Sequence, residues 1–226
     1  MMEKKMPIDV EGFVKPLMDT VQRVITDPAG FYREMPKSGG LADPIIFVVS
    51  MGVAAGLIKA ILGIVGIGVA ASFFMALASI IIVPIFGVIF GFIGAAILFL
   101  IWKALGSQES FEVSFRCLAY AMAISPITAV LNVIPYIGPI VGLVWMTYLL
   151  VNASTEVHGV QAKMAWIVFG AICAVLALTS ISTQLAARRL SHNLNSLQNL
   201  NKMKPEEAGQ AMGEFLKGLQ KGSGKQ

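Results

Sequence analysis

The sequence predicts an all-α protein, a polytopic bundle of about five transmembrane helices preceded by an amphipathic helix. Composition gives the first indication: 56% of the 226 residues are hydrophobic and only 13% are charged, whereas about a quarter of a typical soluble domain is charged. Between Lys59 and Lys103, 43 consecutive residues include no Asp, Glu, Lys, Arg or His. About 20 apolar residues are enough for a helix to cross the hydrocarbon core. A soluble helix that is apolar on every face would find no packing partner in so small a protein.

The first 43 residues are predicted to form a polar segment outside the membrane. Apolar residues recur at three- and four-residue steps over residues 8–26, which indicates an amphipathic helix. Asp27-Pro28 ends this helix, because the residue before a proline is disfavoured in the helical region. The helix either lies on the membrane surface or binds a protein partner. Its charges balance, which predicts little electrostatic attraction to anionic lipid.

Residues 44–184 are predicted to form the membrane domain. Asp43-Pro44 opens it, since Asp is a good N-cap and Pro suits the first helical position. Pro84 predicts a kink in the second span, and Trp102-Lys103 at its end is typical of an interfacial anchor, with ring and amine at the level of the headgroups. The five predicted spans cover residues 44–67, 72–102, 116–134, 140–155 and 163–184.

The connections between these spans are short. Phe111 and Phe115, four residues apart, predict an amphipathic lead-in to the third span that lies on the membrane surface. Residues 135–139 predict a hairpin turn between the third and fourth spans, and the alternative is a broken helix that exposes carbonyls to an ion, as in transporters. Beyond the fifth span, residues 185–226 are predicted to form a polar C-terminal tail.

Charge distribution favours a cytoplasmic N-terminus. The segment before the first span holds six Lys or Arg residues, and the loops on the opposite side hold none, so the positive-inside rule places the segment in the cytoplasm. An odd number of spans then sends the tail, with seven Lys or Arg residues, to the other side. A six-span alternative divides residues 60–102 into two helices and keeps both ends inside. Five spans are preferred, because a turn at residues 80–84 would lack turn-forming residues.

Laid out in this way, the chain resembles the Yip domain family, the Ypt/Rab-interacting membrane proteins and their prokaryotic relatives. The resemblance covers about residues 20–185 and depends on the order and spacing of short motifs. They are Asp27-Pro28-Ala29-Gly30-Phe31-Tyr32, Pro36, Asp43-Pro44, Ser110-Phe111-Glu112, Ala119-Tyr120-Ala121, Ser125-Pro126, Ile134-Pro135-Tyr136-Ile137-Gly138, Trp145, His158-Gly159 and Gln161-Ala162-Lys163.

The resemblance implies five spans, a cytoplasmic N-terminus and a role as a membrane adaptor, which eukaryotic members perform for small GTPases. Asp43-Pro44 matches only part of the family's Asp-Leu-x-Gly-Pro motif. The resemblance therefore does not imply a GTPase partner for this chain. The short N-terminus and loops resemble those of prokaryotic members, for which the family implies a multi-pass protein of the cytoplasmic membrane.

Lys59 is the candidate functional residue within the membrane domain. It lies about 14 residues into the first span, and a cation near mid-bilayer costs on the order of 2.5–3.5 kcal/mol on insertion scales. One interpretation is an ion or substrate site that faces a cavity. The other is that Lys59 extends its amine to the far interface.

Three Gly-x-x-x-Gly pairs predict close approach of helix backbones, through internal packing or through a homo-oligomer. The pairs are Gly52/Gly56, Gly87/Gly91 and Gly138/Gly142.

The sequence offers no carrier for catalysis and predicts no enzyme, cofactor or metal site. His158 has no second ligand at helical spacing, and Cys117 and Cys173 are lone cysteines in apolar stretches. No basic stripe is interleaved with aromatics, so nucleic acid is excluded as a partner. The predicted partners are therefore the lipid bilayer and a protein at the N-terminal segment. The predicted function is a non-enzymatic scaffold or adaptor, and the alternative is a small transporter or channel with Lys59 near its pathway.

Overall fold

The computed structural model describes residues 10–66, 73–200 and 213. Most of the predicted C-terminal tail and the end of the first predicted turn lie outside these residues. In the part that is described, the chain is helical with no β-strand, and five helices are long and apolar enough to cross a membrane. The predicted fold class, a membrane bundle of about five spans, is confirmed. The chain divides into two compact units, Met1–Leu178 and Thr179–Gln226, and the first unit holds the features described below.

The candidate spans begin with α3 (Ala42–Ile64) and α4 (Phe73–Ala104), which pack against each other. The third span is built from three pieces, and the fourth and fifth are single helices. These are α5 (Phe111–Ala121), the 3₁₀ turn η1 (Met122–Ile124), α6 (Ser125–Leu131), α7 (Ile137–Glu156) and α8 (Ala162–Leu200). In α8 the candidate span is Ala162–Ala187.

Pro126 divides the third span. A proline has no N–H to donate, and its ring collides with the carbonyl four residues earlier. The helix therefore tightens to a 3₁₀ turn before α6 begins, with Pro126 in its first turn.

The prediction that Phe111 and Phe115 belong to an amphipathic lead-in on the membrane surface is wrong. Phe115 is 1% exposed and its ring stacks on that of Phe92, with centroids 4.4 Å apart. The helix that starts at Phe111 therefore runs directly into the bundle.

Helices α3 and α4 approach each other through glycine. A Cβ atom built on Gly52 would lie 2.6 Å from the Cα of Pro84, and one on Gly56 would lie 2.6 Å from the carbonyl oxygen of Ser79. The Ser79 hydroxyl donates a hydrogen bond to the carbonyl of Gly56 at 2.9 Å. Pro84 lies inside the continuous helix α4 and is buried against α3.

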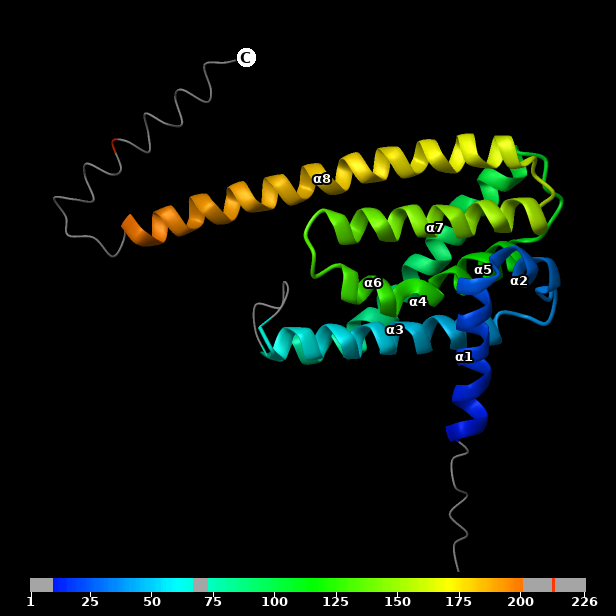
Figure 1. Cartoon of the computed structure of the whole chain (residues 1–226), viewed down its shortest axis with the longest axis horizontal. Helices are drawn as coiled ribbons and strands as arrows, with labels where there is room; N and C mark the ends of the chain where they lie inside the picture. Colours follow the sequence, from blue (N-terminus) through cyan, green and yellow to red (C-terminus); the bar gives the residue numbers. More distant parts are fainter. Residues whose placement is uncertain (1–9, 67–72, 201–212, 214–226) are drawn as a thin grey trace, which may run out of the picture. The chain divides into compact units, whose positions relative to one another are not determined.

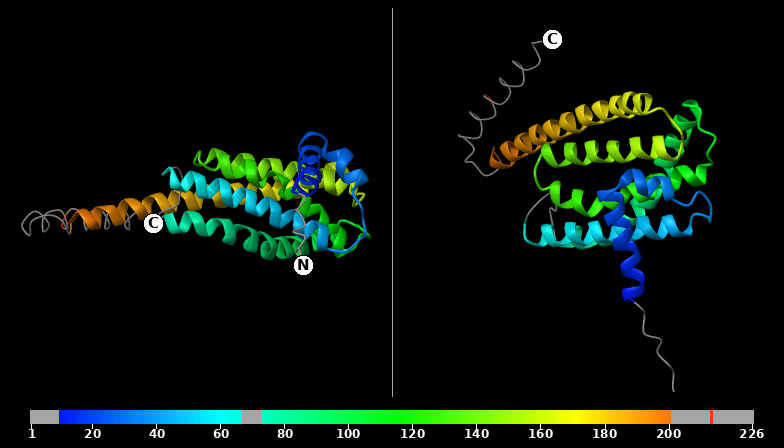
Figure 2. Two further views of the ribbon diagram at one scale, coloured as in Figure 1. Left: turned by 90° about the horizontal axis from the view of Figure 1, so that it is seen from below. Right: turned by 45° about the vertical axis from the view of Figure 1, so that its right-hand side comes forward.

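The N-terminal segment forms two helices at one end of the bundle. α1 (Val10–Thr26) runs across the direction of the spans, as the views in Figures 1 and 2 show, and α2 (Pro28–Glu34) packs on α7. Asp27 caps α2, where its Oδ1 accepts a hydrogen bond from the Gly30 amide at 3.0 Å. The chain then enters α3 at Ala42, slightly before the predicted start, with Asp43 in the first turn.

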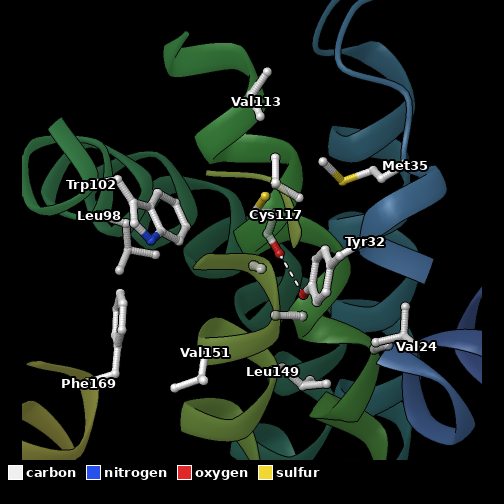
Figure 3. Packing of buried hydrophobic residues seen from close by; sticks show 14 of the residues in the cluster. Val24, Tyr32, Met35, Leu98, Trp102, Val113, Cys117, Leu149, Val151 and Phe169 are labelled. Atoms are coloured by element: carbon white, nitrogen blue, oxygen red, sulfur yellow. Dashed lines mark hydrogen bonds between the residues drawn. The ribbon is translucent and has the colours of Figure 1, made fainter. Parts of the chain in front are cut away.

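The main hydrophobic core joins this segment to the spans (Figure 3). Val24 from α1 and Tyr32 from α2 are fully buried together with residues of the later helices. Those later residues include Leu98, Trp102, Cys117, Leu149, Val151 and Phe169. Trp102 is 0% exposed, so its predicted role as an anchor in the headgroups is wrong, and only the neighbouring Lys103 is exposed.

Candidate functional site

The polar side chains of the first unit gather at one end of the bundle. We call this region the polar end and define it as residues 27–41, 102–117 and 154–160. It combines α2 and the linker between α2 and α3, the connection from α4 into α5, and the connection from α7 to α8. Three groups of interactions hold these segments together.

The first group surrounds His158, which is 7% exposed in the connection between α7 and α8. Its imidazole stacks on the indole of Trp102, with ring centroids 3.8 Å apart and planes 15° apart. The Ser107 hydroxyl lies 2.8 Å from Nδ1, and the Sγ of Cys117 lies 3.8 Å from Nε2. The Trp102 indole N–H in turn donates to the hydroxyl of Ser154 at 2.8 Å. One ring therefore contacts residues of α4, the α4–α5 connection and α5, and Trp102 extends the group to α7.

The environment of His158 favours the neutral imidazole. The Ser107 hydroxyl that contacts Nδ1 also accepts a hydrogen bond from the Glu109 amide at 3.2 Å, so it stands between the ring and the α4–α5 connection. Burial lowers the pKa of His158 to about 4; the Glu109 carboxylate opposes this shift, and the amines of Lys37 and Lys103 add to it. At neutral pH the ring is an uncharged structural contact.

The second group centres on Tyr32. Its hydroxyl, carried by α2, donates a hydrogen bond to the carbonyl oxygen of Cys117 in α5 at 3.1 Å, as drawn in Figure 3. Burial raises the pKa of the Tyr32 hydroxyl well above its usual value, with a smaller contribution from Cys117. The phenol therefore stays protonated and serves as a buried donor that locks α2 onto the third span.

The third group is ionic. The side chain of Arg116 is 2% exposed, and its guanidinium donates to the Glu112 carboxylate at 3.2 Å and to the carbonyl of Gly40 at 2.6 Å. The Gly40 amide donates back to the same carboxylate at 2.8 Å. Gly40 has φ +81°, a conformation that glycine adopts at little cost. The linker before α3 is thereby closed onto the start of α5.

Two more exposed ion pairs connect the N-terminal segment to the loops. Arg33 pairs with Glu156 at 2.9 Å, and Lys37 pairs with Glu109 at 2.7 Å. Exposed pairs of this kind contribute about 0–1 kcal/mol each. They refine the position of α2, whereas Tyr32 and the Arg116 group hold it.

The side chains of the polar end are buried and satisfied by one another. Cys117 and His158 form a thiol–imidazole pair in which Cys117 is 0% exposed. Every buried side-chain nitrogen and oxygen has a hydrogen-bond partner among the residues that the structure describes. Within the same residues, no group of three or more His, Cys, Asp or Glu side chains is arranged to hold a metal ion.

Lys59 lies elsewhere, near the end of α3 that is opposite the polar end. Its side chain is exposed on the outer surface of the bundle, five residues before α3 ends at Ile64. At 1.5 Å per residue this is about 7 Å from the end of the helix, within reach of a lysine side chain. The position favours the interpretation in which the amine extends to the far interface.

The predicted glycine pairs lie at contacts inside the bundle. Gly52 and Gly56 face α4, as described above. Gly87 and Gly91 lie near the side chains of Val48 and Phe115, at 3.6 and 3.9 Å from a built Cβ. Gly138 and Gly142 face α6, where a Cβ on Gly138 would collide with the carbonyl of Leu131 and one on Gly142 would lie 3.1 Å from the Thr128 methyl group.

Sequence reasoning missed most of the polar end, including the roles of Trp102, Ser107 and His158. These residues meet only through the packing of separate helices, so their spacing carries no signal. Arg116 is different, because Glu112 precedes it by four residues and a pair at this spacing shares one helix face. A charged pair at the start of an apolar span could have been identified as a buried contact.

Comparison with known families adds one result. A model of the Yip1 domain matches residues 23–183, a range that runs from α1 through the five candidate spans and includes the whole polar end. Comparison with curated proteins and with solved structures gave no match.

Proposed function

Because the chain belongs to the Yip1 domain family, we propose that it is a non-enzymatic scaffold or adaptor of the membrane, whose N-terminal segment engages a protein partner. One observation carries this proposal: α2 is held rigidly at the polar end. Tyr32 is fully buried and bonded to α5, so the exposed side of the same short helix is presented in one fixed orientation. A preorganised surface binds at a lower entropic cost than a flexible one.

The exposed side of this segment is charged and solvated. Arg33 and Glu34 on α2 have side-chain exposures of 66% and 68%, and Arg23 at the end of α1 has 51%. Arg23 and Glu34 pair at 2.6 Å, so the surface carries both signs of charge. Mixed charge of this kind supports specificity and orientation in a protein interface more than affinity.

The proposed orientation puts this surface in the cytoplasm. The six Lys and Arg residues before α3 support it. With five spans, the chain beyond α8 then starts on the opposite side of the membrane. A reporter fused after Gln226 tests the orientation directly, and a cytoplasmic signal from that reporter would contradict it.

Deleting the N-terminal segment is not a clean test of partner binding, because Val24 and Tyr32 belong to the hydrophobic core. We suggest a photo-crosslinking amino acid at Glu34 in the full chain, in native membranes. The matched control carries it at Ile64, which is 52% exposed at the opposite end of α3.

A discrete crosslinked protein at Glu34 but not at Ile64 is expected, and Arg33→Glu should reduce its yield. Identical products at the two positions, or lipid adducts alone, would contradict a partner at the polar end.

A further inference from the structure

The apolar face of α1 is covered over only part of its length. Leu17, Val21 and Val24 lie on one side of the helix at four- and three-residue steps and pack into the main core. Phe13, four residues before Leu17, continues this side toward the N-terminus and is 53% exposed. At the edge of the apolar face, Val14 and Met18 are 43% and 59% exposed. Among the residues that the structure describes, this apolar face thus packs into the core at its C-terminal end and is exposed toward its N-terminal end.

The level of α1 along the third span indicates what surrounds the N-terminal half of α1, where the apolar side chains are exposed. α1 packs against α5 and η1, and η1 begins at Met122, six residues beyond Arg116, the last charged residue of the third span. Six helical residues correspond to about 9 Å along the axis. α1 also runs across the spans rather than along them (Figure 1). A crosswise helix at this depth lies at the boundary between headgroups and acyl chains.

We propose that the N-terminal half of α1 is an in-plane membrane helix, with Phe13, Val14 and Met18 inserted into the lipid that surrounds the bundle. Apolar side chains of the spans are exposed in the same way, among them Ile46 and Val49 on α3. In-plane helices of this kind bury their apolar side about 5–10 Å into the boundary region.

The balanced charge of α1 indicates that apolar contact, and not electrostatic attraction, holds this helix in lipid. The described residues of α1 carry Glu11, Lys15, Asp19 and Arg23, two acidic and two basic side chains, so the helix has no net attraction to an anionic surface. Insertion should therefore occur in neutral lipid and should resist salt. The charged side of α1 then faces water, and it stays free for the partner proposed above without depending on that partner.

A spin-label experiment on the purified full chain tests this inference. Nitroxides are attached at Phe13→Cys and Met18→Cys, with Lys15→Cys on the charged side of the same helix as the matched control. All three are made in a Cys173→Ser background, because Cys117 is buried and does not label. The protein is placed in phosphatidylcholine nanodiscs, and collision with oxygen is compared with collision with a water-soluble nickel chelate.

High oxygen and low nickel accessibility at the labels on residues 13 and 18, with the reverse at residue 15, is the expected result. The contrast should persist in high salt. Equal nickel accessibility at residues 13 and 15 would overturn the proposal, because the face would then be in water. Low accessibility to both reagents with dipolar broadening between labels would also overturn it, in favour of a second copy. Since no partner is present, failure of the crosslinking experiment at Glu34 leaves this result unaffected.

Discussion

Acidification should weaken the polar end through His158. The unfolded imidazole takes up a proton below pH 6.5, whereas the folded one does so only below about 4, because burial against Trp102 excludes the charged form. Between these two values the unfolded state binds more protons, so stability falls as the pH falls. The stabilisation is fully present above pH 6.5 and is lost progressively down to about pH 4.

The size of the effect follows from the two pKa values. The full shift corresponds to about 3 kcal/mol at 1.36 kcal/mol per unit of pKa. Relative to pH 8, the loss should be about 1 kcal/mol at pH 6 and about 2 kcal/mol at pH 5. Glu109, Lys37 and Lys103 act on the ring from the α4–α5 connection, the linker after α2 and the end of α4, so the control has to retain all three.

Unfolding in mixed micelles, followed by tryptophan fluorescence at pH 8, 6 and 5, measures this loss. His158→Gln provides the control, because its amide keeps hydrogen-bonding capacity and does not titrate. The difference in unfolding free energy between the two proteins should shrink by about 2 kcal/mol from pH 8 to pH 5. Parallel pH profiles would refute the assignment of a buried neutral imidazole.

Five further changes test other parts of the structure, the first four by the same unfolding assay and the last by membrane insertion and solute flux. Tyr32→Phe should cost about 1 kcal/mol, the net value of one hydrogen bond, and an unchanged stability would remove the phenol from the core network. Arg116→Met should cost about 3 kcal/mol, because a buried, multiply bonded ion group loses one partner. Gly52→Ala should cost about 1–3 kcal/mol through overpacking, while Gly170→Ala, with no atom within 4 Å of the added Cβ, should be neutral or stabilise by up to about 1 kcal/mol. Lys59→Leu should preserve folding and raise the efficiency of membrane insertion, and a loss of solute flux in proteoliposomes would instead support the transporter alternative.

The spans were predictable because their signal is local. A run without charge between Lys59 and Lys103 is suited to a lipid environment, and the helix break at Asp27-Pro28 follows from backbone chemistry. The third span ends at Leu131, three residues before its predicted end at residue 134, and α7 begins at Ile137 inside the predicted turn. The glycine positions in α3 could be identified from spacing, although spacing does not say which helix they face.

The polar end was not predictable, because its contacts join segments far apart in the sequence. Trp102 beside Lys103 has the composition of an interfacial anchor, and only tertiary packing decides that the indole turns inward to stack on His158. Phe111 and Phe115 show the same limit. Their spacing indicates an apolar face correctly, but it does not distinguish a face turned to lipid headgroups from one stacked on Phe92.

The shared core of Val24, Tyr32 and Phe169 has a consequence for biosynthesis. The ribosome delivers the first two residues long before the last span, and at about 5–20 residues per second the interval is on the order of 10 s. During that time α2 has no complete docking site, and Tyr32 has no finished cavity to enter. The core that holds the N-terminal segment can therefore be completed only after Phe169 in α8 has been synthesised.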